Sequence, residues 1–187
     1  GYDPYAGSGG GGTMVNTSPG DVGGPTGGTA SHIATAYGHS SIDSTPDSNS
    51  EVGKGSRENL LIPGMSVASS AYPPGTALRV WDSSGTYVGD FVVGDRPLSN
   101  SGRALDFYSG NDPALYNYYA GLGNLQVQQI GTGPLIPFSA KGDPAAIQSA
   151  MGNWQSGQGQ VANNFPQYFG QNGVSLSNQP QVTPQEY

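Results

Sequence analysis

The chain has 187 residues, enough for one domain with extensions, and a net charge of -7. Its six Lys and Arg residues are too few for a nucleic-acid-binding surface, and no apolar run approaches the roughly 18 residues of a membrane span. Cysteine is absent, which excludes disulfides, thiolate metal sites and a cysteine nucleophile. With 31 Gly, 15 Pro and only 10% charged residues, the composition favours an extracellular or assembled protein.

Residues 1–30 are Gly-rich and predict a linker or arm, because they offer too little apolar surface to offset the entropy of ordering. Six short apolar or alternating runs follow, separated by turn residues, and each predicts a strand: 32–37, 64–70, 77–82, 86–95, 104–108 and 124–130. The turn "YPPGT" at 72–76 combines proline with glycine, and Gly89 suggests a bulge within its strand.

Two Asp-Pro pairs predict helix starts, since aspartate is a good N-cap and proline suits the first helical position. The first helix is expected within 111–123, with Asp112 as its N-cap, and the second within 143–155. Tyr116, Tyr118 and Tyr119 are interpreted as packing residues in preference to a carbohydrate platform. Six strands and one helix in about 100 residues favour a small closed β-barrel.

The changes in composition along the chain predict four segments. They are a Gly-rich arm at 1–30, a barrel at 31–131, a linker with a short helix at 132–156, and a Gln/Asn-rich extended arm at 157–187. The two arms are expected to contact a larger protein assembly.

Two aspartates lie inside predicted strands, where apolar side chains are expected. Asp95 ends the run "FVVGD" and Asp106 is the centre of "ALDFY". A carboxylate removed from water is costly unless it is paired or hydrogen-bonded. The two residues are therefore either structural groups with satisfied hydrogen bonds or groups retained for chemistry.

Four stretches resemble a known family: "ATAY" (34–37), "SVASSAYPPGTALRV" (66–80), "VVGDRPLSNSGRALDFYSG" (92–110) and "DPALYNYYAGLGNLQVQQI" (112–130). Together they are similar to the three-aspartate domain family and to the catalytic barrel of the membrane-bound lytic transglycosylase A type. Rare lipoprotein A barrels and expansins are more distantly similar. The resemblance implies a mainly β fold, a six-stranded double-psi β-barrel with one or two short helices and long irregular terminal arms.

The resemblance also implies a reaction and a site. Asp106 matches the residue that acts as acid and base in cleaving the peptidoglycan glycan strand between N-acetylmuramic acid and N-acetylglucosamine, and Asp95 matches its partner aspartate. The sugar contacts are expected from Tyr37, Ser99, Asn100 and Tyr108, with no cofactor and no metal. The family commonly has a third aspartate before the Pro-Gly-Thr turn, where this chain has Ser69 and Ser70.

Other interpretations remain open. An inverting hydrolase would need a second carboxylate, which Asp43 or Asp47 would supply. His32 and His39 with Asp43 would be a metal set in principle, although two surface histidines are the simpler interpretation. A non-catalytic barrel would bind glycan or serve as a structural module, for example in a phage tail or capsid. In each case the protein is expected outside the cytoplasm, in the periplasm, at the cell surface or on a virion.

Overall fold

The structure is a computed structural model, and it describes residues 25, 28–39, 53–97, 102–152, 154 and 159–168. Six strands are present among these residues: β1 (Ala30–Tyr37), β2 (Ser66–Ala68), β3 (Thr76–Asp82), β4 (Tyr87–Asp95), β5 (Ala104–Tyr108) and β6 (Asn124–Thr132). The strand positions agree with the six runs predicted from the sequence. Strand β2 is shorter than its run because Ser69 and Ser70 enter the turn that follows.

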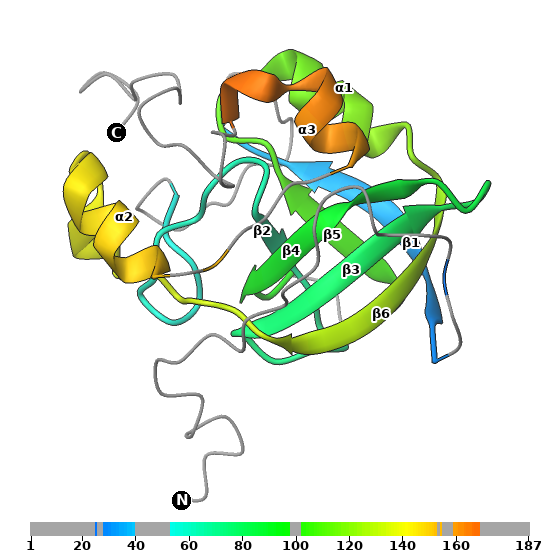
Figure 1. The fold of residues 1–187 in the computed structure, drawn as a ribbon, viewed down its shortest axis with the longest axis horizontal. Coiled ribbons are helices and arrows are strands. Elements are labelled where there is room, and N and C mark those ends of the chain that lie inside the picture. The colour runs from blue at the N-terminus through cyan, green and yellow to red at the C-terminus, as the bar shows by residue number, and fades with distance from the viewer. Residues whose placement is uncertain are drawn as a thin grey trace, which may run out of the picture.

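The six strands close into a barrel in the order β1-β5-β2-β4-β3-β6. Strands β1 and β5 are parallel, as are β2 and β4, while the other four pairings are antiparallel. The predicted fold class, a mainly β protein built on a six-stranded barrel, is therefore confirmed. Figure 1 shows the barrel with β3 and β6 toward the viewer.

The barrel interior is filled by apolar side chains from every strand. Val67, Leu78, Phe91 and Leu105 are among the residues with no exposed surface. Phe107 stacks on Tyr119 with the ring centroids 4.7 Å apart. Burying such side chains contributes about 1.5–3 kcal/mol each, so this core supplies most of the stabilisation of the fold.

Helix α1 (Pro113–Ala120) closes one end of the barrel, and its start follows the predicted capping rule. The Asp112 carboxylate accepts hydrogen bonds from the backbone N–H groups of Ala114 and Leu115, at 2.9 and 3.1 Å. Tyr119 is buried and Tyr118 packs edge-on against Phe165. Helix α2 (Pro144–Met151) starts in the same way at Asp143. The packing interpretation of the tyrosines holds for these two residues.

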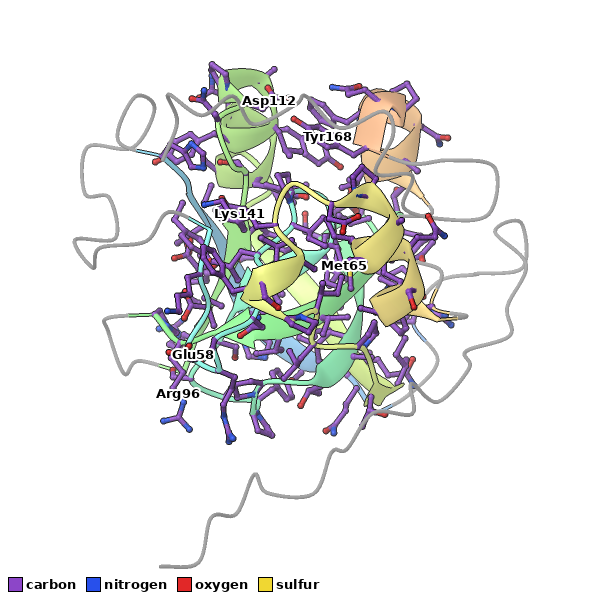
Figure 2. All side chains as sticks on the ribbon, turned by 90° about the vertical axis from the view of Figure 1, so that its left-hand side faces the viewer. Glu58, Met65, Arg96, Asp112, Lys141 and Tyr168 are labelled. Atoms are coloured by element: carbon purple, nitrogen blue, oxygen red, sulfur yellow. The ribbon has the colours of Figure 1, made fainter. Side chains whose placement is uncertain are left out.

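The chain after residue 157 departs from the predicted extended arm in its described part. Helix α3 (Gln160–Asn164) and a 3-10 turn (Pro166–Tyr168) lie against the barrel and beside α1 (Figure 1). Val161 and Tyr168 are buried, and the Tyr168 hydroxyl donates a 2.6 Å hydrogen bond to Asp112 (Figure 2). Tertiary contacts hold this polar stretch against the barrel. Its overall composition does not predict these contacts, because they depend on a few apolar side chains.

Candidate functional site

Asp106 is at the centre of β5 and points away from the barrel interior. Its neighbours Leu105 and Phe107 have no exposed surface, whereas Asp106 is half-buried. Successive strand residues alternate between faces, so Asp106 belongs to the outer face. Any group that desolvates the Asp106 carboxyl must therefore lie on that outer face.

Thr35 is a hydrogen-bond partner of Asp106 on the neighbouring strand. It is the residue of β1 that pairs with Asp106, and its hydroxyl donates a 2.9 Å hydrogen bond to Asp106 Oδ1. Hydrogen bonds to a charged carboxylate are stronger than neutral ones and favour the ionised form. Thr35 thus holds the carboxyl group in a defined orientation.

Asp95 lies in the same row of paired residues as Asp106. Across the neighbouring strands β1, β5, β2 and β4, the row runs Thr35, Asp106, Ala68 and Asp95. The two aspartates are separated by one strand, which sets their Cα atoms about 10 Å apart. The residue of β2 that pairs with both aspartates is Ala68, whose side chain is a single methyl group.

The Asp95 carboxylate is buried, with 9% of the residue exposed. Its Oδ1 accepts a 2.8 Å hydrogen bond from the backbone N–H of Arg96, which offsets part of the cost of burying the carboxylate. The backbone carbonyl oxygen of Asp95 separately accepts a 3.1 Å hydrogen bond from Ser69 N–H, which fixes the main chain at this residue. The structural and chemical interpretations of Asp95 are not exclusive, because the same bonds that satisfy it also orient it.

Tyr37 and Tyr108 flank the row on its β1 and β5 side. They are paired across the two strands, and their rings lie 5.3 Å apart. Tyr108 is only 5% exposed, and its hydroxyl is 3.0 Å from Nε2 of His39. The half-buried Tyr37 therefore offers more ring surface than Tyr108. Ser99 and Asn100, the other predicted sugar contacts, lie outside the described residues, as do Asp43 and Asp47.

Ser69 and Ser70 lie where the resemblance leads one to expect a third aspartate. Ser69 has no exposed surface, and its hydroxyl accepts hydrogen bonds from the backbone N–H groups of Ala71 and Tyr72 at 3.0 and 3.3 Å. Serine and aspartate side chains both stabilise turns through such bonds. Ser70 accepts another from Gly102 N–H, just before β5, at 3.0 Å. The turn is thus maintained without the carboxylate.

The two histidines considered as metal ligands have other roles in the structure. His32 is buried, with Nδ1 3.2 Å from the carbonyl oxygen of Arg103 and Nε2 3.1 Å from the Tyr72 hydroxyl. Burial lowers the pKa of His32, and the Arg103 carbonyl partly opposes this. No group of three or more His, Cys, Asp or Glu that could hold a metal is found within the described part of the chain.

The sequence pattern indicated Asp95 and Asp106 as candidates but gave no signal for Thr35. The contact joins residues 71 positions apart and depends on the parallel pairing of β1 with β5. The alternation in "HIATAYGH" does place Thr35 on the same face as Tyr37. The strand order needed to bring that face beside Asp106 is not readable from the sequence.

Comparisons with known proteins found similarity among solved structures. No protein-family model matches the chain, and no curated protein matches it. Two crystal structures of MltA from Escherichia coli, one titled as revealing a unique lytic transglycosylase fold, are similar at 31% and 28% identity, with TM-scores of 0.33 and 0.30. The matches cover 48% and 46% of this chain and 30% of the bacterial chain, so the chain spans less than a third of that protein.

Among the described residues, no helix is both long and apolar enough to cross a membrane.

Proposed function

We propose that this chain cleaves the glycan strand of peptidoglycan by the lytic transglycosylase reaction, with Asp106 as its acid and base. The observation that carries the proposal is the row Thr35, Asp106, Ala68 and Asp95 on the outer face of the barrel. The two aspartates that the family resemblance assigns to the reaction lie in one row, and both pair with Ala68 of β2.

The proposed reaction begins with a protonated Asp106. Its carboxyl group donates the proton to the glycosidic oxygen between N-acetylmuramic acid and N-acetylglucosamine, and the bond from that oxygen to the anomeric carbon breaks. The Asp106 carboxylate then takes the proton of the muramoyl 6-hydroxyl, whose oxygen bonds to the anomeric carbon. Asp106 ends protonated, no water is consumed, and the product carries a 1,6-anhydro ring.

Each neighbour of Asp106 has a separate role in this proposal. Thr35 orients the carboxyl group through its bond to Oδ1. Asp95 adds negative charge to the same outer face, and a nearby like charge favours the protonated form that the acid step requires. Tyr37 offers ring surface for a sugar, whereas the less exposed Tyr108 supports Tyr37 from the adjacent strand. Ser99 and Asn100 remain proposed sugar contacts.

The substrate also suggests where the protein acts. Peptidoglycan lies outside the cytoplasmic membrane, so we place this activity in the periplasm or outside the cell. We also propose that residues 1–30 and 157–187 contact a larger assembly, at the cell surface or on a virion.

The alternative function is a non-catalytic barrel that binds glycan or has a structural role. One observation favours it: Ser69 and Ser70 stand where the family resemblance leads one to expect a third carboxylate, and the Ser69 hydroxyl is used by the turn. The barrel would then retain Asp95 and Asp106 for their structural hydrogen bonds.

Digestion of purified peptidoglycan, with products identified by mass spectrometry, tests the proposal. We expect 1,6-anhydromuropeptides from the wild type and none from Asp106→Asn, because the amide cannot donate and retrieve the proton. Asp143→Asn, which changes an exposed aspartate at the start of α2, is the matched control and should cleave normally.

Each other outcome selects a different function. Products with reducing ends would identify a hydrolase instead of a lytic transglycosylase. If the folded wild type yields no product, the non-catalytic barrel is correct, and co-sedimentation with peptidoglycan separates glycan binding from a structural role.

A further inference from the structure

Strand β4 contains an irregularity immediately before Asp95. Val67 of β2 pairs with Val93, but the next residue, Ala68, pairs with Asp95. Gly94 is therefore an extra residue without a partner on β2, which is the definition of a β-bulge.

The bulge determines which face of the barrel Asp95 joins. Val93 pairs with Val67, and both lie in the apolar core with no exposed surface. Regular alternation would return the second residue after Val93, which is Asp95, to the same interior face. The extra residue shifts the register by one, so Asp95 pairs with Ala68 in the outward-facing row of Asp106.

One buried side chain binds the bulged residue. Asn59 is 3% exposed, and its Nδ2 donates a 3.0 Å hydrogen bond to the carbonyl oxygen of Gly94. Its Oδ1 accepts a 3.2 Å hydrogen bond from the backbone N–H of Arg57. Asn59 therefore satisfies a strand carbonyl that has no partner residue on β2.

The loop that carries Asn59 is itself braced on both sides. The Gly55 N–H donates a 2.8 Å hydrogen bond to the Asn59 carbonyl oxygen, and the Leu60 N–H donates a 2.7 Å hydrogen bond to the Ile136 carbonyl oxygen. Gly55 lies so close that a Cβ there would be 2.2 Å from the Gly94 carbonyl oxygen. Figure 2 shows Glu58, next to Asn59, and Arg96, next to Asp95, at the same edge of the molecule.

We infer that Asn59 is a positioning residue, which holds the bulge at Gly94 and thereby keeps the Asp95 carboxylate on the face of Asp106. The effect of Asn59 on the position of Asp95 does not depend on the proposed function, whereas its effect on cleavage rests on that function. Asn59 acts through the Gly94 carbonyl and not through the substrate.

Asn59→Asp is the sharpest test, because it keeps the size of the side chain and the Oδ1 acceptor but removes the donor to Gly94. Gly55→Ala disturbs the same contact by another route, since its methyl group would overlap both the Gly94 carbonyl oxygen and the Asn59 side-chain amide. Asp143→Ala removes the N-cap of α2, away from the bulge, and is the control for a general loss of stability.

Amide NMR spectra and hydrogen exchange test the geometry without any activity. The reporters are the N–H groups of Ser69 and Arg96, which both donate to Asp95. In Asn59→Asp and Gly55→Ala we expect these two signals to shift and to exchange at least about tenfold faster than in the wild type. In both variants the amide signals of β3 and β6 should keep their wild-type positions. In Asp143→Ala the signals of Ser69, Arg96, β3 and β6 should all be unchanged.

A double-mutant cycle tests the consequence for cleavage. Asn59→Asp should lower kcat/KM about 10- to 100-fold, as expected when a catalytic group is misplaced. In an Asp95→Asn background the same change should cost less than about twofold, because the residue through which Asn59 acts is already removed.

Two results overturn the inference. If the Ser69 and Arg96 signals are unchanged in folded Asn59→Asp, Asn59 does not hold the bulge. If Asn59→Asp lowers kcat/KM equally in the wild-type and Asp95→Asn backgrounds, Asn59 affects the fold in general and does not act through Asp95. If the wild type itself does not cleave peptidoglycan, the proposed function fails, and the NMR result alone decides the positioning role.

Discussion

At the scale of single residues, the contact between Thr35 and Asp106 determines how the candidate acid is held. The bond length is 2.9 Å, and the two residues are paired on adjacent strands, which keeps the hydroxyl and the carboxylate within hydrogen-bonding distance. Removal of the hydroxyl alone is therefore an informative change.

Thr35→Val keeps the shape of the side chain but removes the donor. We expect kcat for peptidoglycan cleavage to decrease about tenfold, since a hydrogen bond to a charged group contributes about 1.5 kcal/mol at an accessible site. Thr35→Ser retains the hydroxyl and should stay within about threefold of the wild type. Equal activity of the valine and serine variants would show that Thr35 has no such role.

His32 should make the stability of the folded chain dependent on pH. Burial lowers its pKa, so the folded protein keeps the ring neutral where the unfolded chain binds a proton. The contribution to stability is complete above about pH 6.5 and is lost as the pH falls from there toward the lowered pKa.

Urea unfolding between pH 7.5 and 5 measures this effect. The decrease in the free energy of unfolding should be smaller in His32→Gln, which cannot titrate, than in the wild type. Parallel curves for the two proteins would rule out His32 as the cause.

Among elements, β3 and β4 are joined on the barrel wall by a buried ion pair. Nε and an Nη of Arg79 each donate a 2.9 Å hydrogen bond to the Asp90 carboxylate, and both residues are at most 9% exposed. The hydrogen bond to Asp90 also raises the pKa of Arg79. This two-bond geometry fixes the register of the two strands as well as pairing their charges.

Asp90→Ala should lower the free energy of unfolding by roughly 3–5 kcal/mol, because it leaves a guanidinium buried without its carboxylate. The matched control is Glu58→Gln, which breaks the exposed pair of Glu58 with Lys54, 3.4 Å apart. That surface pair should contribute less than about 1 kcal/mol. Urea unfolding measures the free energy of unfolding of the two variants. Similar decreases in both would contradict the larger contribution expected from the buried pair.

Most elements were predictable because their signals are local. Apolar or alternating runs predicted β3, β4, β5 and β6, and the Asp-Pro pairs predicted the starts of α1 and α2. The bulge in β4 was predicted at Gly89, where β4 does lose register with β3 beside that residue. The second bulge at Gly94 was not predicted, because it depends on the pairing with β2.

Over the whole molecule, the barrel is completed by a segment that is distant in sequence. Val161, Phe165 and Tyr168 are buried, and Gln160 donates a 2.9 Å hydrogen bond to Asp82 at the end of β3. The Tyr168 hydroxyl binds the same aspartate that caps α1. Residues 159–168 thus contact both the barrel wall and its end helix.

Truncation after Gln158 should therefore destabilise the barrel. Three apolar side chains at about 1.5–3 kcal/mol each predict a loss of roughly 5 kcal/mol or more. Tyr168→Phe, which removes only the bond to Asp112, should cost about 1–2 kcal/mol. Thermal and urea unfolding measure the stability of the truncated chain and of Tyr168→Phe. An unchanged unfolding midpoint in the truncated chain would show that residues 159–168 do not stabilise the barrel.

Local sequence patterns predict the strands, the helix starts and the two unusual aspartates, because each depends on neighbours within a few residues. Which residues of different strands lie side by side depends on the tertiary structure. Closure of the barrel sets Thr35 beside Asp106, and the bulge bound by Asn59 brings Asp95 into their row. These relations depend on contacts between residues far apart in the sequence, such as Thr35 with Asp106 and Ala68 with Asp95, which no local pattern specifies.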